Sequence, residues 1–578
     1  MFQFHVAPSG DDSSPGSAER PFATLERARS AAREASGDVV VHLRAGTHVL
    51  SGPLELTEAD SGVVYQAYGF GTSDQEEAVV SGGRRVEGWR ERDGVWTADV
   101  GDLDFRQLYV DGRRASRAGI PGLPGAATPT VTGYVTDSAD PRGWRSPGDV
   151  EFVYRGVYPW TEARCGVAGV SADRDTTVIT MAQPAFAWAA ELYNSVWDGR
   201  TSSGPGLPTR IENDASFLRE PGTFVLDRSR PGRHVLRYLP LPGEDPERAE
   251  VVAPVLETLV RAAGTRNVSF RGLVFADATW LRPSRPEGFV HYHGSGYYEG
   301  GGVETAVFGE GASVTYPVAS ASIPACVTLK DVAGVAFENC RFTRLGASGL
   351  GISGGSEVSV RGCDLDTLSG GGVSVSGGRD VTIEDTWVHH VGLEYSGSPG
   401  ISVSGARRCT IARNEIADVP HCGIVLGPGE GARVLRNLTV DTMGVLADGG
   451  GIYLSSAQGS SPDDGALVRG NVIEDTRTRY NFGLYTDYGA SWVTLEGNVV
   501  ARADSTAILT VAPPLENVVY RGNFWDADPV GHDSPPAGVT YEGNVTIGDE
   551  RELNAATAAI RSRAGLLRPR PGSRSSGS

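Results

Sequence analysis

Two aspartates in the C-terminal half of the chain have neighbours that suit acid–base chemistry. Asp448 precedes three glycines in the segment ADGGGIYL, and Asp487 ends the segment GLYTD. Paired carboxylates near aromatic and histidine side chains indicate glycosidic cleavage, because one acid protonates the leaving oxygen while the other carboxylate attacks the anomeric carbon or activates water. Asp448 and Asp487 are therefore the predicted catalytic residues.

Several polar and aromatic side chains in this part of the chain, together with one tryptophan before it, are candidates for substrate binding. They are Glu394, His390, His421, Tyr453, Tyr485 and Trp280. Plainer interpretations stay open beside these. Asp448 before its glycines is also a natural turn residue, and Tyr453 and Tyr485 could form a sugar-stacking pair or a cross-strand aromatic pair.

The elements that must position these residues follow a repeat. Short alternating segments, from VAFENC to VTYEGN, each end in one small or amide residue, in steps of 23, 23, 28, 23, 34, 27, 25 and 21 residues. The end residues are Cys340, Cys363, Thr386, Asn414, Asn437, Asn471, Asn498, Asn523 and Asn544. Strands that stack about 4.8 Å apart would lay these residues on one another. An Asn stack can then hydrogen-bond its own backbone and the Asn above.

A second series of glycine-led strands, from GLGIS at Gly349 to GLYTD at Gly483, shares this period. Two series with one period predict two strands per coil of an all-β, right-handed parallel β-helix. A propeller blade needs roughly 40 residues or more, and a sandwich has no strict ladder. Cys340 and Cys363 then occupy adjacent ladder positions, where stacked buried thiols are favoured over a disulfide.

Coils longer than 23 residues locate the insertions, and several of these precede the glycine-led strand. They fall near Gly392–Pro399, Gly444–Gly449, Ala457–Asp464 and Arg477–Asn481. Loops grouped on one edge of a solenoid usually form its binding face. The register raises one difficulty, because Asp448 and Asp487 are offset by seven residues, roughly 23 Å on straight strands. A catalytic pair therefore requires the glycine turn to fold Asp448 back over the strand.

The rest of the chain divides into four predicted parts. Residues 1–110 hold the first coils and a capping helix with Thr24 as its N-cap. Residues 111–250 break the ladder and predict an inserted β-rich subdomain, and residues 251–562 form the main β-helix. Residues 563–578, rich in Arg, Pro, Ser and Gly, are expected to be a disordered tail.

Composition narrows the partners. The formal net charge of −19 disfavours nucleic acid, anionic membranes and polyanionic glycans, and is compatible with a neutral carbohydrate. The sequence contains no run of 18 apolar residues, so no membrane span is expected. None of the six cysteines sits in a CxxC pair, so structural zinc is not expected. No other metal and no cofactor are expected. The chain is expected to be a monomer or a weak oligomer. No signal peptide is evident, which fits a cytoplasmic protein or a trimmed mature form.

The opening FHVAPSGDD, followed by PFATLERA and VVVHLRAGTHVL, resembles β-helix carbohydrate-active enzymes of glycoside hydrolase family 141, and more distantly the family 120 xylosidases. The likeness continues through RQLYVDGRRASRA and FRGLVFADATW to GLYTDYGASWVTLEGNVV, and covers most of the chain. It implies secretion and hydrolysis of plant cell-wall glycans, with xylan and fucosylated pectin as substrate classes.

The resemblance also implies two catalytic carboxylates. Asp448 matches the family's DGG-aliphatic-Tyr turn, and Asp487 matches its Gly-Ile-Tyr-Leu-Asp strand end. Gly451, Thr486 and Tyr488 depart from that pattern and leave the substrate open. Two alternatives remain: a polysaccharide lyase or epimerase on the same fold, and a non-catalytic glycan-binding β-helix.

Overall fold

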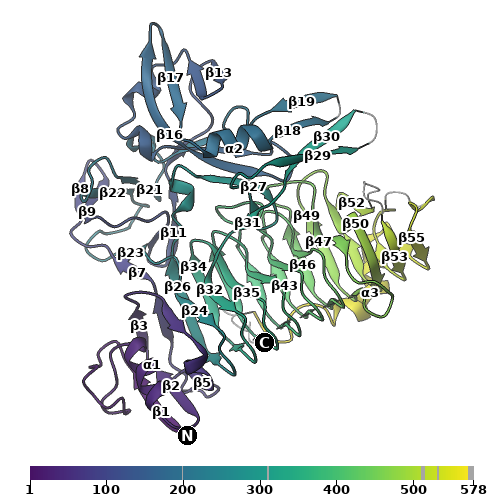
Figure 1. Ribbon diagram of the computed structural model, residues 1–578, viewed down its shortest axis with the longest axis horizontal. Coiled ribbons are helices and arrows are strands. Elements are labelled where there is room, and N and C mark those ends of the chain that lie inside the picture. The colour runs from purple at the N-terminus through teal and green to yellow at the C-terminus, as the bar shows by residue number, and fades with distance from the viewer. Residues whose placement is uncertain (198, 309–310, 509–514, 530–532, 571–578) are drawn as a thin grey trace. The chain divides into compact units, whose positions relative to one another are not determined.

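The computed structural model in Figure 1 describes residues 1–197, 199–308, 311–508, 515–529 and 533–570. The chain forms two compact units. The first comprises Met1–Gly82, Thr258–Ala276 and Pro324–Ser578, and the second comprises Gly83–Glu257 and Asp277–Ile323. No helix among the described residues is long and apolar enough to cross a membrane.

The first unit is a right-handed parallel β-helix, in which each regular coil contributes three strands (Figure 1). The glycine-led series comprises β4 (Leu54–Leu56), β24 (Val260–Ala263), β32 (Ala325–Lys330), β35 (Ser348–Ser353), β38 (Val373–Ser376), β41 (Ile401–Ser404), β44 (Ile424–Leu426), β47 (Gly450–Ala457), β50 (Phe482–Glu496) and β52 (Ser505–Ile508). The series before the ladder residues comprises β1 (Phe2–Val6), β2 (Val39–Leu43), β5 (Val63–Ala67), β25 (Ser269–Arg271), β33 (Ala336–Glu338), β36 (Ser359–Arg361), β39 (Thr382–Glu384), β42 (Thr410–Ala412), β45 (Arg433–Leu435), β48 (Ala466–Arg469), the second half of β50, β53 (Glu516–Arg521) and β55 (Val539–Glu542).

A third series follows the ladder residues and forms a separate 12-stranded sheet, so the prediction of two strands per coil was wrong. It comprises β3 (Gly46–Val49), β6 (Ala78–Ser81), β26 (Leu273–Ala278), β34 (Arg341–Leu345), β37 (Asp364–Leu368), β40 (Trp387–His389), β43 (Glu415–Ala417), β46 (Leu438–Thr442), β49 (Val472–Thr476), β51 (Val499–Ala501), β54 (Phe524–Trp525) and β56 (Val545–Thr546). These strands begin directly after the ladder residue and share no single motif, which hid them in the sequence.

The asparagine ladder is present and ties successive coils together. Asn414 Nδ2 donates to Asn437 Oδ1 at 2.9 Å, and Asn437 Nδ2 donates to Asn471 Oδ1 at 2.9 Å. The second Nδ2 proton of Asn414 goes to the carbonyl of Ile383 in the preceding coil, instead of to its own coil as expected. Each amide thus bonds the coil before it and the coil after it. Cys340 and Cys363 are free buried thiols, as predicted.

Helices lie near the two ends of this unit. Helix α1 (Leu25–Glu34) begins at Thr24, whose hydroxyl accepts the Arg27 N–H at 3.1 Å, which confirms the predicted N-cap. A 3₁₀ turn, η1 (Glu58–Asp60), lies between β4 and β5. Helix α3 (Glu550–Arg561) follows the last coil.

The segment after α3 is ordered as far as it is described. The N–H of Gly565 donates to Arg436 O at 2.9 Å, and the N–H of Leu567 donates to Asp385 Oδ1 at 2.7 Å. The prediction of a disordered tail was therefore wrong for residues 563–570, because backbone hydrogen bonds hold this stretch along the coils. Residues 571–578 lie outside the described residues.

The second unit is built mainly from antiparallel sheets. An eight-stranded sheet contains β7 (Gly83–Arg85), β23 (Val251–Pro254), β10 (Leu108–Val110), β11 (Arg113–Arg117), β21 (Thr223–Asp227), β22 (His234–Leu239), β9 (Val95–Gly101) and β8 (Arg90–Arg92). A ten-stranded sheet contains β12 (Gly119–Ile120), β20 (Arg210–Glu212), β15 (Glu151–Arg155), β16 (Glu162–Asp173), β17 (Thr176–Met181), β14 (Gly133–Thr136), β13 (Ala127–Thr130), β27 (Phe289–His293), β28 (Gly296–Tyr297) and β31 (Ala321–Ser322).

A four-stranded sheet and short helical turns complete the second unit. The remaining elements are β19 (Arg200–Ser203), β18 (Asn194–Trp197), β30 (Ala312–Pro317), β29 (Val303–Phe308), α2 (Ala185–Leu192), η2 (Asp140–Gly143), η3 (Pro147–Asp149), η4 (Ala215–Phe217) and η5 (Arg282–Ser284). The unit begins at Gly83, earlier than the expected position 111, and takes in a second segment, Asp277–Ile323. The early strands β7, β9, β10 and β11 pair with β21, β22 and β23, and β8 pairs with β9, so these strands belong to the second unit and not to the solenoid.

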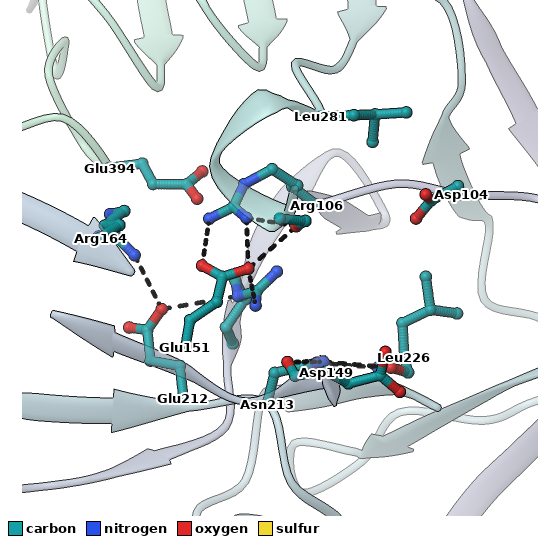
Figure 2. A network of polar contacts seen from close by, with 12 residues as sticks. Asp104, Arg106, Asp149, Glu151, Arg164, Glu212, Asn213, Leu226, Leu281 and Glu394 are labelled. Carbon is teal, nitrogen blue, oxygen red and sulfur yellow. Dashed lines mark hydrogen bonds and ion pairs between the residues drawn. The ribbon is translucent and has the colours of Figure 1, made fainter. Parts of the chain in front are cut away.

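A buried ion network crosses the interior of the second unit. Figure 2 shows the carboxylate of Glu151 between the guanidinium group of Arg106 and the pair formed by Arg164 and Glu212. Arg106 donates to both oxygens of Glu151, at 2.5 and 2.9 Å, and Arg117 donates at 2.9 Å. Burial alone would raise the pKa of Glu151, but the arginine charges outweigh it and lower the pKa to about 2.

Candidate active site

Asp448 lies in the turn between β46 and β47, and contacts from two neighbouring coils hold its backbone. Its φ angle is 57°, in the left-handed region, and its N–H donates to Tyr480 O at 2.8 Å in the next coil. In the preceding coil, Nε2 of His421 lies 3.1 Å from the carbonyl oxygen of Ala447. A carbonyl only accepts, so His421 donates this bond from Nε2. Hydrogen bonds from the coil before and the coil after therefore hold the backbone at Ala447 and Asp448.

The glycines after Asp448 allow the chain to pass close to both neighbouring coils. A Cβ at Gly449 would lie 2.7 Å from Cys422 Sγ and 2.9 Å from His421 Nε2. A Cβ at Gly450 would lie 2.5 Å from the carbonyl oxygen of Phe482. These distances are shorter than van der Waals contact, so any side chain here would push the turn away from its neighbours.

Asp487 lies on β50, directly beside the strand that follows Asp448. Strands β47 and β50 are parallel, with Tyr453 opposite Tyr485 and Ser455 opposite Asp487. Because side chains alternate along a strand, Tyr485 and Asp487 share one face, while Thr486 between them points inward and is fully buried. The hydroxyl of Tyr453 donates to Asp487 Oδ2 at 2.9 Å.

The two carboxyl groups converge on one phenol. The hydroxyl of Tyr485 donates to Asp448 Oδ1 at 3.1 Å, and the same side chain lowers the pKa of Asp487. The negative charge of Asp487 also acts on Asp448, so the two carboxyl groups interact. The separation of roughly 23 Å on straight strands does not arise, because the chain turns back at Asp448.

The two carboxyl groups have different environments. Burial, followed by the negative charge of Asp487, raises the pKa of Asp448 to about 7, although the hydrogen bond from Tyr485 opposes the shift. Burial also raises the pKa of Asp487, but hydrogen bonds from the Tyr453 hydroxyl and the Tyr488 N–H oppose the rise, and Tyr485 lowers the pKa as well. With more donors, Asp487 is the group better suited to carry a negative charge while Asp448 holds a proton.

An apolar wall stands behind the pair. It consists of the buried residues Cys422, Val425, Met443, Tyr453, Phe482 and Tyr485. The rings of Tyr453 and Tyr485 meet edge to face, with centroids 5.1 Å apart. Only 4% and 1% of these two residues are exposed, so they form the predicted cross-strand pair and present little ring surface. Substrate binding by Tyr453 and Tyr485 stays a prediction.

Three other residues predicted to bind substrate contact residues other than the two aspartates. His390 is exposed beyond β40, with its Nδ1 2.8 Å from His389 Nδ1. Glu394 accepts the hydroxyl of Ser369 at 3.4 Å. Trp280 belongs to the second unit, where its ring packs edge to face on Phe289 at 5.8 Å. Their roles stay predictions. His421 does lie at the site, but only 1% of it is exposed, and it is hydrogen-bonded to the turn before Asp448. Its binding of substrate stays a prediction.

Five residues at the site were missed by the sequence reasoning. Cys422, Val425, Met443 and Phe482 line the apolar wall, and the carbonyl of Tyr480 accepts the Asp448 N–H. The predicted insertions at Gly444–Gly449 and Arg477–Asn481 do lie at the same corner as Gly392–Pro399, between the third-series and glycine-led strands, whereas Ala457–Asp464 follows β47 at another corner. The insertion at Arg477–Asn481 was the signal that could have pointed to Tyr480.

One group of side chains among the described residues has the spacing of metal ligands. One ligand atom each from Asp364, Asp366 and His389 lie within 4.8 Å of one another, on β37 and β40. Arg341 donates to Asp366 at 2.7 Å, and His389 lies 3.2 Å from Asp364. The guanidinium group supplies positive charge to this acidic cluster, which is several coils from Asp448.

Comparison with known proteins supports the fold. The family model described as "Right handed beta helix region" matches residues 320–459. A solved structure named "Glycoside hydrolase" is 22% identical, with 98% of this chain and 99% of that chain covered and a TM-score of 0.75. The structure titled "The complex structure of XylC with xylose" is 12% identical, covers 90% of this chain and 75% of that one, and has a TM-score of 0.53. No curated protein matches the chain. The chain therefore shares the right-handed parallel β-helix fold of these structures.

Proposed function

We propose that the protein is a glycoside hydrolase whose catalytic residues are Asp448 and Asp487. The observation that carries the proposal is the convergence of two carboxyl groups of different pKa on the hydroxyl of Tyr485. Glycosidases need one protonated and one ionised carboxyl group across the scissile bond. An Asp448 pKa of about 7 beside an Asp487 that accepts more hydrogen bonds meets this need near neutral pH.

In the proposed reaction Asp448 is the general acid and Asp487 is the nucleophile or base. Asp448 gives its proton to the glycosidic oxygen as the bond from that oxygen to the anomeric carbon breaks. Asp487 either forms a bond to the anomeric carbon, which water later hydrolyses, or removes a proton from the water that attacks it. The hydroxyl groups of Tyr453 and Tyr485 hold the carboxylates in place.

A neutral plant cell-wall glycan is the proposed substrate class, with xylose- or fucose-containing glycans first. A net charge of −19 repels polyuronates and leaves neutral sugars unaffected. The structural neighbour whose title names a xylose complex makes xylosides the first choice to assay. Secretion is proposed on the same grounds, since such polymers lie outside the cell.

The test is hydrolysis of a panel of aryl glycosides and plant polysaccharides by the wild-type chain and by Asp448→Asn and Asp487→Asn. The proposal predicts new reducing ends with the wild type and a loss of rate of about 10²-fold or more in each variant. An unsaturated product that absorbs in the ultraviolet would instead identify a lyase. Glycan binding without turnover would identify a binding module.

A further inference from the structure

A row of aromatic rings leads from the carboxylate pair to the surface. Tyr485 contacts Phe482 with ring centroids 4.4 Å apart, and Phe482 contacts Tyr480 at 5.5 Å. Phe482 is only 4% exposed, whereas Tyr480 is 39% exposed. Tyr480 is therefore the member of this row that presents ring surface to solvent, next to the residues proposed to cleave the substrate.

The backbone of Tyr480 is held in an unfavourable conformation. Its φ angle is 59°, in the left-handed region, where a bulky side chain is uncommon and glycine or asparagine is less strained. Its N–H donates to Asp504 Oδ2 at 2.7 Å, and its carbonyl accepts the Asp448 N–H at 2.8 Å. Strained residues that the surrounding structure holds in place cluster at functional sites. The ring, and not the backbone, is what a tyrosine adds here.

The hydrogen bond from Asp448 fixes which side of the substrate Tyr480 would meet. Asp448 is the proposed acid, so its carboxyl group faces the oxygen of the leaving group. The residue bonded to the backbone of Asp448 then lies on the leaving-group side of the scissile bond. An exposed aromatic ring suits the C–H face of a neutral pyranose, which is apolar and can lie against the ring.

We propose that Tyr480 is a sugar-stacking residue that binds the leaving-group sugar, and that it sets the preference for substrates with a sugar at that position. This inference rests on the proposed function. It commits the site to a neutral sugar or short oligosaccharide on the leaving-group side, and to an aromatic contact as the source of the preference.

The test uses Tyr480→Asn, because asparagine tolerates the left-handed conformation and removes the ring. KM is measured for a disaccharide and for the matching glycosyl fluoride, which carries no leaving-group sugar. The ratio of the first KM to the second is expected to rise about tenfold in Tyr480→Asn, as for the loss of one aromatic contact. Tyr480→Phe, which keeps the ring, is expected to restore the ratio to within about twofold.

Phe2→Ala is the matched control. Phe2 is 45% exposed on β1 in the first coil, so its truncation removes exposed aromatic surface many coils from Asp448. Its KM ratio should equal that of the wild type. The melting temperature of Tyr480→Asn should match or exceed the wild-type value, because asparagine relieves the strain.

Each contrary result has its own meaning. An unchanged KM ratio in Tyr480→Asn overturns the stacking role while the proposed function stands. A lower melting temperature, or a shifted pH profile of kcat, would make Tyr480 a structural or positioning residue and overturns the inference as well. A wild-type chain that hydrolyses no glycoside overturns the proposed function, and the subsite with it.

Discussion

Tyr485 donates a hydrogen bond to Asp448 Oδ1 at 3.1 Å, although the two residues are 37 positions apart and lie in neighbouring coils. The contact exists because the chain turns back at Asp448, where glycines let it approach both adjacent coils. The same side chain also lowers the pKa of Asp487. Tyr485 is thus the side chain through which the geometry of one carboxyl group depends on the other.

Asp448 as the general acid predicts a dependence on the leaving group. Asp448→Asn should slow hydrolysis of a glycoside with a sugar leaving group by about 10²-fold or more, because that oxygen needs a proton. A dinitrophenyl glycoside has a leaving group that departs without protonation and should be affected far less. Steady-state kcat/KM values for the two substrates measure this difference. Equal losses would assign the acid role to another residue.

The pH profile of kcat/KM should be bell-shaped. Activity requires Asp448 protonated and Asp487 ionised, so the alkaline limb should fall near pH 7 and the acid limb above the ordinary aspartate value. Tyr453→Phe removes a donor from Asp487 and should move only the acid limb upward. Tyr485→Phe removes the donor to Asp448 and a hydroxyl that lowers the pKa of Asp487, so both limbs should move upward. Rates of the three proteins across pH 4–9 would check this, and limbs that stay in place would contradict it.

His421 should act through the position of Asp448. His421→Leu removes the hydrogen bond to the Ala447 carbonyl and should lower kcat by about 10- to 100-fold with little change in KM, because small displacements of a catalytic group are costly. His421→Gln, whose amide can donate from a similar place, should recover much of the loss. The measurement is kcat and KM of the wild type and of both variants, compared among proteins whose melting temperatures match. A rise in KM alone would point to substrate contact instead.

Asp448 should destabilise the folded protein above neutral pH. Its pKa is about 7 when folded and close to 3.8 when unfolded, so the free-energy penalty is absent below about pH 4, grows through the interval, and is complete above pH 7. Asp448→Asn should therefore be more stable than the wild type by about 1–2 kcal/mol at pH 8 and equal to it at pH 4, allowing for partial exposure. Denaturant unfolding at both values tests the sign.

Glu151 should be essential to the stability of the second unit. Glu151→Gln leaves Arg106 and Arg117 uncompensated and should cost about 3–5 kcal/mol of unfolding free energy. The pKa of Glu151 is lowered to about 2, so its contribution is present above pH 4.5 and is lost as the pH falls towards 2. Arg469→Met, which breaks an exposed pair with Glu496, should cost no more than about 1 kcal/mol. Similar costs would contradict the argument.

The solenoid could be predicted because its coils repeat one amide position. The Asn414–Asn437–Asn471 stack appears in the sequence as recurring strand ends. Thr24 could be predicted as a helix N-cap from its residue type and place in the sequence. The third strand of each coil could not be predicted, since segments such as RFTRL and VIEDT have no residue in common at any one position.

The site was only half predictable for a related reason. A ladder gives the register along a strand, so the pairing of Tyr453 with Tyr485 follows from it. It does not give the path of a turn between strands. Asp448 reaches Tyr485 because of a left-handed backbone and contacts with His421 and Tyr480, which depend on coils before and after it.

A double-mutant cycle tests the central claim most directly, that Asp448 and Asp487 act as one catalytic pair. Values of kcat/KM would be measured for the wild type, Asp448→Asn, Asp487→Asn and the double variant on one glycoside with a sugar leaving group. Residues that act as a unit are strongly non-additive. Each single variant should lose about 10²-fold or more, and the double variant should be no slower than the slower single one. Wild-type activity in either single variant would contradict the assignment.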